Sequence, residues 1–293
     1  MRGPKLLVSV AVCSIVACSL ADLDGFAGGE PTAGPDGGPS DAKVVTTAPD
    51  GRDGTAATET EAGGLPTDAY GDAVRADEPA AWWRFEDADG TRTLEDATGQ
   101  HHAQVLPRQD KPITIQWGIP GISGSAAKLT NAGGYFEVGD VFDFAGLSEL
   151  ALEAWVQNES PAAEYETVFV KRVEISGDPQ TGWIVFLHKP AMNVGFQFWK
   201  AQNVSASTSV GPLPPGFHHL VVNATKRADG VEYAMFLDGE LRDRDGKNVV
   251  EQDDTTAPLA LGFNWNGALD EMAIYEHALA PERILAHYRV VHP

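Results

Sequence analysis

Between residues 149 and 241 the sequence is divided into short apolar runs, each of strand length and each bounded by turn residues. The runs are rich in β-branched and aromatic residues, which favour extended backbone. They are Glu149–Gln157, Trp183–His188, Phe196–Trp199, Leu220–Thr225 and Glu232–Leu237. Asp229-Gly230 and Asp238-Gly239 lie between runs and are strong hairpin signals. The pattern predicts an all-β domain of antiparallel strands.

The run Glu149–Gln157 alternates clearly between two faces. Successive side chains of a strand point to opposite sides, so Leu150, Leu152, Ala154 and Val156 share one face. The other face carries the remaining residues, which are Glu149, Ala151, Glu153, Trp155 and Gln157. We expect the first face in the core and the second to be polar and half-exposed.

One segment near the C-terminal end of the sequence has the features of a helix. Pro281 suits a first helical turn, and Ile284 and Tyr288 lie one turn apart on a single side. We expect a short C-terminal helix that caps one end of the β domain.

The N-terminus has the organisation of an export signal. Arg2 and Lys5 precede the apolar stretch Leu6–Ala17, which is too short to span the roughly 30 Å of a bilayer core as a helix. Residues 1–17 are therefore predicted to be a signal peptide. Its end, Ile15-Val16-Ala17-Cys18, resembles the bacterial lipobox, and this resemblance implies cleavage before Cys18 and lipidation of its thiol.

The cysteine content favours lipidation over an ordinary secretory signal in which Cys18 is incidental. The chain has two cysteines, and Cys13 lies within the segment to be removed. Disulfide bonds are thereby excluded from the mature chain, so Cys18 has another use. Ser19 resembles the residue that directs Gram-negative lipoproteins to the outer membrane. We expect a lipid-anchored protein of the bacterial cell envelope, at the outer membrane.

Composition separates a linker from a single domain. Residues 18–78 are dominated by Gly, Pro, Ala, Thr and Asp, and such a segment cannot bury enough apolar surface to offset the entropy of ordering. We predict a disordered acidic linker there and one domain over residues 79–293. The net charge of −21 and pI near 4.6 exclude nucleic acid as a partner and leave the lipid as the membrane contact.

Several motifs of the domain resemble those of LamG-like jellyroll domains, which belong to the concanavalin A-like lectin and glucanase group. In chain order the motifs are 80–103 (AAWWRFEDADGTRTLEDATGQHHA), 150–156, 216–222 (GFHHLVV), 233–241 (YAMFLDGEL), 267–275 (GALDEMAIY) and 278–284 (ALAPERI). The resemblance implies a sandwich of two antiparallel sheets with the first and last strands side by side. It implies no single function, because this jelly roll carries lectins, adhesion modules, inert calcium-bound domains and glycosidases.

Asp270 is the candidate for a structural calcium ligand. Strict alternation puts Asp270 on one face with Met272 and Ile274, where a carboxylate is costly to bury without a partner. Further oxygen ligands are expected from the opening strand and its loop, at Glu86, Asp87 and Asp96. The alternative is that Asp270 accepts hydrogen bonds from backbone N–H groups or from Arg84.

Motifs for catalysis are missing from the sequence. Glycoside hydrolysis needs two carboxyls across the scissile bond, and the closest pattern is Glu149 with Glu153 on one strand. His218 and His219 are adjacent and face opposite ways on a strand, so we expect hydrogen-bonded histidines and no shared metal ion. His101-His102 has no third ligand at a convincing spacing. We expect a protein that is not an enzyme.

The candidate ligand-binding residues are aromatic residues and amides. Trp265 is flanked by Asn264 and Asn266 beside a turn glycine, and Trp199 departs from the alternation of Phe196 and Phe198. A stacking ring with nearby amides suits the face of a sugar. The alternative, which the loop position favours, is that Trp265 fills one end of the sandwich.

These residues favour a tethered recognition or adhesion module that binds glycan or another extracellular polymer without catalysis. One alternative is a structural envelope lipoprotein that acts through protein contacts, and another is a glycoside hydrolase or lyase of the same fold.

Overall fold

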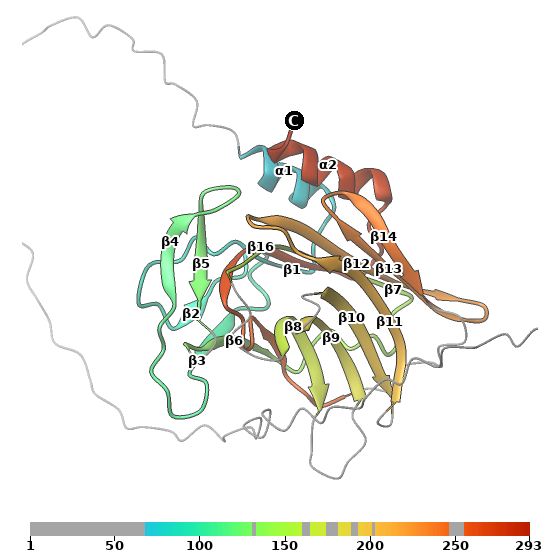
Figure 1. Cartoon of the computed structure of the whole chain (residues 1–293), viewed down its shortest axis with the longest axis horizontal. Coiled ribbons are helices and arrows are strands. Elements are labelled where there is room, and N and C mark those ends of the chain that lie inside the picture. The colour runs from blue at the N-terminus through green and yellow to red at the C-terminus, as the bar shows by residue number, and fades with distance from the viewer. Residues whose placement is uncertain are drawn as a thin grey trace, which may run out of the picture.

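The chain forms a sandwich of two antiparallel β-sheets with two helices on one side (Figure 1). The computed structural model describes residues 68–293 apart from 131–132, 160–164, 174–180, 189–192, 201–202 and 246–254. The predicted signal peptide, Cys18 and residues 19–67 lie outside the described residues. The all-β sandwich predicted from the sequence is confirmed within them.

Each sheet combines a run of consecutive strands with strands from distant parts of the chain. In the first sheet the order is β14 (Glu240–Asp245), β13 (Gly230–Leu237), β12 (His218–Arg227), β7 (Glu149–Asn158), β16 (Gly267–Tyr275), β5 (Ser125–Leu129) and β4 (Gln116–Pro120), with β1 (Ala81–Trp83) also paired to β16. In the second sheet the order is β11 (Asn203–Pro212), β10 (Asn193–Lys200), β9 (Thr181–His188), β8 (Tyr165–Val173), β15 (Leu259–Leu261), β6 (Tyr135–Gly139), β3 (Ala103–Leu106) and β2 (Thr93–Leu94).

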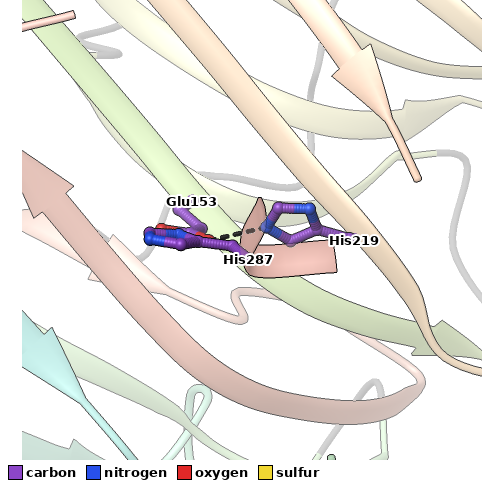
Figure 2. Close-up of side chains that lie close together, drawn as sticks. All are labelled: Glu153, His219 and His287. Atoms are coloured by element: carbon purple, nitrogen blue, oxygen red, sulfur yellow. Dashed lines mark hydrogen bonds and ion pairs between the residues drawn. The ribbon is translucent and has the colours of Figure 1, made fainter. Parts of the chain in front are cut away.

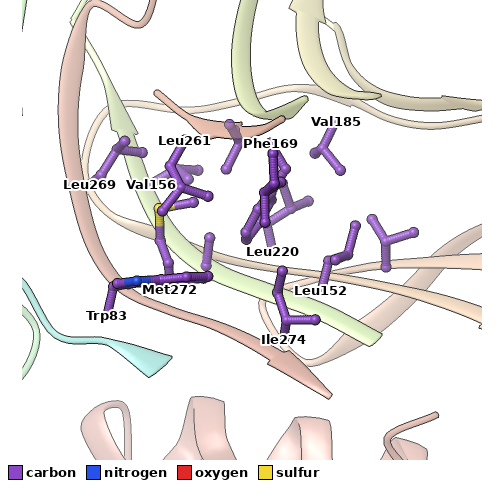
Figure 3. Packing of buried hydrophobic residues seen from close by; sticks show 14 of the residues in the cluster. Trp83, Leu152, Val156, Phe169, Val185, Leu220, Leu261, Leu269, Met272 and Ile274 are labelled. Carbon is purple, nitrogen blue, oxygen red and sulfur yellow. The ribbon is translucent and has the colours of Figure 1, made fainter. Parts of the chain in front are cut away.

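The main core fills the space between the two sheets (Figure 3). The four alternating apolar residues of β7, from Leu150 to Val156, all face this core, as predicted. Trp183, Val185 and Leu187 of β9 contribute the same face of the second sheet. Period-two alternation is thus enough to decide which side of these strands is buried.

The first and last strands, β1 and β16, lie side by side, as the resemblance implies. In the register of β1 and β16, Ala81 pairs with Ile274 and Trp83 with Met272. The Asp238-Gly239 hairpin also forms, and both residues have positive φ, 55° and 77°. Positive φ at both central positions is the conformation that a tight two-residue hairpin requires.

Helices α1 (Ala69–Ala76) and α2 (Pro281–Val291) cover the outer face of the first sheet (Figure 1). Tyr70 and Val74 of α1 and Ile284 of α2 pack in an apolar cluster on that face. The helix at Pro281 is confirmed, but it lies over a sheet face where an end cap was expected. Neither helix in the described part of the chain is long and apolar enough to cross a membrane.

Helix α1 corrects the predicted boundary between linker and domain. The segment 18–78 was assigned to linker, yet its last residues are helical and packed on the sheet. Asp68 caps the helix by accepting a hydrogen bond from the Gly71 N–H. Residues 68–78 therefore belong to the domain, because Tyr70 and Val74 bury apolar surface that composition averaging hides.

The same helices correct the expectation for the second face of β7. Glu153 and Trp155 were expected on a polar, half-exposed face, but both side chains are fully buried. Burial follows from α1 and α2, which lie over this part of the sheet. Glu153 therefore needs partners within the protein.

Candidate functional site

The outer face of the second sheet carries aromatic side chains that are separate from the main core. Ile184 and Phe186 of β9 belong to a second apolar cluster on this side, and Trp199 and Tyr165 pack against it while partly exposed. Trp199 points away from the core residues Phe196 and Phe198, as alternation along β10 requires. We define the Trp199 face as Trp199, Gln197, Ile184, Phe186, Tyr165 and His188.

At one end of this face, Trp199 is held by an arginine. The Arg172 guanidinium lies over its indole ring, 5.1 Å from the ring centroid. Gly182 pairs with both residues across β9, and its lack of a side chain lets the two approach. A cation over an indole restrains the ring and leaves its remaining surface free to stack.

At the other end of the Trp199 face, Tyr165 and His188 are stacked, with centroids 4.5 Å apart and an interplanar angle of 17°. Both are partly exposed. His188 lies six positions along β9 from Gly182, which corresponds to about 20 Å of extended strand. Gln197 lies between the two aromatic pairs and is also partly exposed, so an amide is available along this surface.

Trp265 does not form a stacking platform. Its side chain is fully buried in the main core, and its indole Nε1 donates to the Ala268 carbonyl at 3.3 Å. The prediction that Trp265 meets a ligand is corrected: the ring fills the interior of the sandwich, which was the alternative reading of its position.

The amides beside Trp265 belong to a tightly bonded loop. The Asn266 N–H donates to Glu166 Oε2 at 3.1 Å, and its carbonyl accepts from Asn158 Nδ2. Asn264 is buried and has a φ of 61°, a left-handed conformation that asparagine tolerates. These residues hold the turn before β16, and Glu166, which the sequence did not single out, is the carboxylate that anchors it.

Asp270 lies on the opposite face from the one that strict alternation predicts. The pairing of β16 with β7 shifts between Asp270 and Ala273, and Glu271 has a φ of 45°. Such a bulge reverses the side-chain directions that follow it. Met272 and Ile274 therefore face the core, while Asp270 lies opposite Trp155 of β7 on the helix-covered side.

The Asp270 carboxylate accepts two backbone hydrogen bonds, from Ile122 N–H at 2.6 Å and Glu271 N–H at 2.9 Å. Arg84 pairs instead with Glu271, at 2.9 Å. Burial, together with the neighbouring Glu271 and Glu86, raises the pKa of Asp270 to about 9. A carboxyl in this position holds either a proton or a cation at neutral pH.

Glu86 reaches the same turn between β4 and β5 as Asp270. Its Oε1 accepts from the Ser125 N–H at 3.0 Å. A Cβ on Gly121 would meet Asp270 Oδ2 and the Ser125 carbonyl, and one on Gly124 would meet the Glu86 carboxylate. The two glycines thus let both carboxylates approach the backbone of this turn, which a Cβ at either position would prevent.

The other two predicted calcium ligands have different roles. Both carboxylate oxygens of Asp96 are taken by the loop that follows, including the N–H groups of Thr98 and His101. Asp96 also accepts from the Trp82 N–H and thereby fixes the loop to β1. Asp87 accepts from the Glu95 N–H at 3.0 Å, and burial raises its pKa. The structure does not bring Asp96 to Asp270.

A second group of ligand-type side chains lies beneath the helices, where Glu153, His219 and His287 converge (Figure 2). Glu153 Oε1 is 2.6 Å from His219 Nε2 and 2.9 Å from His287 Nδ1. The Tyr275 hydroxyl donates to Glu153 Oε2 at 2.5 Å and that of Tyr70 to Oε1 at 3.1 Å. Although burial alone would raise the pKa of Glu153, the two histidines hold it well below its usual range.

A family model described as the concanavalin A-like lectin/glucanases superfamily matches residues 130–285, which is more than half of the chain. The chain belongs to this superfamily. No curated protein matches the chain in sequence.

Solved structures share this concanavalin A-like fold at low sequence identity. Domain 4 of AbnA, an extracellular arabinanase of Geobacillus stearothermophilus solved with arabinotriose, is 20% identical with a TM-score of 0.55, over 72% of this chain and 98% of that chain. The binding domain of botulinum neurotoxin DC, in complex with SialylT, is 12% identical with a TM-score of 0.51; the match covers 72% of this chain and 50% of that chain. A Trypanosoma rangeli sialidase is 14% identical with a TM-score of 0.51; the match covers 71% of this chain and 32% of that chain.

Membership of the concanavalin A-like superfamily agrees with the resemblance drawn from the motifs, and the structure adds what the motifs lack. His218 and His219 do face opposite ways, toward Asp238 and Glu153 respectively. The sequence missed His287, because its approach to Glu153 depends on how α2 docks. The one sequence signal for the burial of Glu153 is that its neighbours on the same face of β7, Ala151 and Trp155, are apolar.

Proposed function

We propose that the chain is a lipid-tethered extracytoplasmic module that binds glycan without breaking it, and that the Trp199 face is the binding surface. The observation that carries the proposal is the pair of aromatic platforms about 20 Å apart along one sheet face, formed by Trp199 with Arg172 and by Tyr165 with His188. Rings that stack on sugar faces, with an amide such as Gln197 between them, suit an extended oligosaccharide.

The ligands of similar folds support a carbohydrate as the class of partner. The arabinanase domain was solved with arabinotriose, and the binding domain of botulinum neurotoxin DC in complex with SialylT. The six residues that define the Trp199 face include no carboxylate, which is consistent with a non-catalytic role for that surface. Hydrolysis of a glycosidic bond would require two.

The tether extends the proposal to a location in the cell envelope. Lipidation at Cys18 would leave residues 18–67 between the membrane and the first described helix. A flexible chain of this length has an r.m.s. reach of about 40 Å. Such a tether presents the domain outward from an outer membrane, where polymers are available to bind.

Glycan binding by the full chain tests the proposal directly. We expect saturable binding to arabinan-type or sialylated glycans on an array, and Trp199→Ala should weaken it at least tenfold, as loss of a central aromatic contact does. Phe217→Ala is the matched control, because Phe217 is a partly buried aromatic residue on the helix-covered side. Absence of binding to any glycan would favour a protein partner, and equal losses in both variants would exclude the Trp199 face.

We also propose calcium as a structural ion at the turn between β4 and β5. Asp270 and Glu86 would supply carboxylate oxygens and Ser125 a carbonyl oxygen, with water completing the six to eight ligands that calcium takes. The ion would neutralise the buried charge of Asp270 and fix the turn to β16.

Calcium is accordingly expected to raise the melting temperature of the full chain relative to chelator. At one hundred times the dissociation constant the stabilisation amounts to about 2.7 kcal/mol. Asp270→Asn should remove the calcium response, while Asp87→Asn, which changes a carboxylate outside the site, should keep it. Equal melting temperatures with calcium and with chelator would rule out a stabilising ion here.

A further inference from the structure

The cluster of Glu153, His219 and His287 combines complete burial with the donor types of a transition-metal site. The three residues come from β7, β12 and α2, and each is 0% exposed. Their ligand atoms lie within 4.8 Å of one another (Figure 2). Two imidazoles with one carboxylate are a set that suits zinc and related ions, whereas calcium and magnesium prefer oxygen alone.

The tautomer of His287 is fixed in the form that a metal ligand needs. Its Nε2 lies 2.8 Å from Asp77 Oδ2 and 3.2 Å from the Ala73 carbonyl, both of which accept hydrogen bonds. Nε2 must therefore carry the proton, and Nδ1 is the nitrogen that faces Glu153. A carboxylate on the remote nitrogen of a histidine is the usual support for a metal-bound imidazole.

His219 is free to adopt the matching tautomer. Its Nε2 faces Glu153, and its Nδ1 is buried without a hydrogen-bond partner among the described residues. Moving the proton from Nε2 to Nδ1 breaks no hydrogen bond at Nδ1, but it gives up the bond to Glu153 and leaves a buried N–H without an acceptor, a cost that the bond to a metal must offset. That move exposes the Nε2 lone pair to the same point that His287 Nδ1 and Glu153 Oε1 face.

The cluster requires a positive charge between its imidazoles and its carboxylate. With His287 neutral and protonated on Nε2, the Nδ1 lone pair would oppose the oxygen of Glu153 at 2.9 Å. Either an extra proton on His287 or a cation removes this repulsion. A divalent ion satisfies both imidazoles and the carboxylate at once.

We propose that Glu153 Oε1, His219 Nε2 and His287 Nδ1 bind a zinc-class divalent ion, with a water molecule as the fourth ligand. Tetrahedral zinc at about 2.0–2.1 Å from each ligand requires ligand atoms about 3.3 Å apart. The present N···O distances of 2.6 and 2.9 Å must therefore open by about half an ångström. Binding releases the proton of His287 Nδ1, while the proton of His219 moves to its own Nδ1.

The ion would fasten both helices to the first sheet. His287 belongs to α2, and its partners Asp77 and Ala73 belong to α1 and its C-terminal cap. A domain with no cysteine after residue 18 has no disulfide to perform this task. The three ligands are fully buried, so the role inferred for the ion is to hold the helices on the sheet.

Metal loading of the full chain tests this inference independently of glycan binding. After stripping with chelator, the chain is expected to take up one Zn²⁺, with release of about one proton, and to melt at a higher temperature. Co²⁺ in its place should give the visible absorption of a tetrahedral nitrogen–oxygen site. His287→Gln should abolish both signals, and His102→Gln, which changes an exposed histidine outside the cluster, should leave them unchanged.

A variant that keeps all three ligands guards against loss of folding. Asp77→Asn leaves the three ligands in place, weakens both the support behind His287 and the ion pair of Asp77 with Arg283, and is expected to weaken Zn²⁺ binding by about 10- to 100-fold. Sub-stoichiometric uptake by the wild-type chain, or a cobalt spectrum that His287→Gln does not change, would overturn the proposal. The cluster would then be a hydrogen-bonded network with a protonated His287.

Discussion

Replacing Glu153 by glutamine is expected to lower the free energy of unfolding by about 3–5 kcal/mol, the usual cost of removing one partner of a buried charged pair. Glu153 Oε1 faces His219, His287 and Tyr70, and Oε2 accepts from Tyr275. Glutamine has nearly the same shape, but its amide offers one acceptor oxygen and places N–H donors where acceptors are needed. Urea unfolding in the presence of chelator measures the loss without any contribution from bound metal.

Glu240→Gln provides the comparison for this measurement. Glu240 forms an exposed ion pair with Arg242, and such surface pairs contribute about 0–1 kcal/mol. A loss below 1 kcal/mol for Glu153→Gln as well would mean that the carboxylate does not balance charge beneath the helices. The account of how α1 and α2 are held would then be wrong.

Replacing Gly267 by alanine is expected to destabilise the domain by about 3 kcal/mol or more, since left-handed strain and an overfilled site each cost roughly 1–3 kcal/mol. Gly267 opens β16 with a φ of 148°, directly opposite Asn158 of β7. A Cβ there would collide with the Gln157 carbonyl oxygen and come within 3.0 Å of the Asn158 Cα. These are backbone atoms of the neighbouring strand, so relief requires separating the two strands.

Gly90→Ala isolates the conformational part of this effect. Gly90 has a φ of 80°, but no atom lies within 4 Å of the position its Cβ would take. The strain alone should cost about 1–2 kcal/mol. Thermal unfolding of both variants compares them, and equal losses would show that the close approach of β16 to β7 contributes nothing.

The parts of the fold that follow local rules could be predicted from the sequence. Alternation placed Leu150 and its partners in the core, and Asp238-Gly239 fixed a hairpin, because both depend only on neighbouring residues. Pro281 marked the start of α2 for the same reason. The motif resemblance added the pairing of β1 with β16, which no local pattern contains.

The candidate sites were harder to predict because they depend on irregularities and on distant contacts. The bulge at Glu271 reversed the face assigned to Asp270, and nothing in its neighbours announces a bulge. Trp265 stands between two amides, as the aromatic residue of a binding loop would, but its ring packs into the main core between the two sheets. His287 reaches Glu153 only after α2 has docked on the sheet.

The two outer faces of the sandwich are consequently used in different ways. The outer face of the first sheet is covered by the two helices, with a buried charged cluster beneath them. The outer face of the second sheet carries partly exposed aromatic side chains. A ligand can therefore bind the outer face of the second sheet without displacing the helices from the first. This division is the basis for assigning recognition to the Trp199 face.

Fluorescence quenching by acrylamide tests that assignment most directly. All seven tryptophans lie in described residues; six are at most 8% exposed, and Trp199 alone is partly exposed, so accessible quenching reports on Trp199. We predict that a bound oligosaccharide reduces quenching in a saturable manner, with the concentration dependence of binding itself. Saturating glycan that leaves the quenching unchanged would contradict the account, because the ligand would then bind away from the Trp199 face.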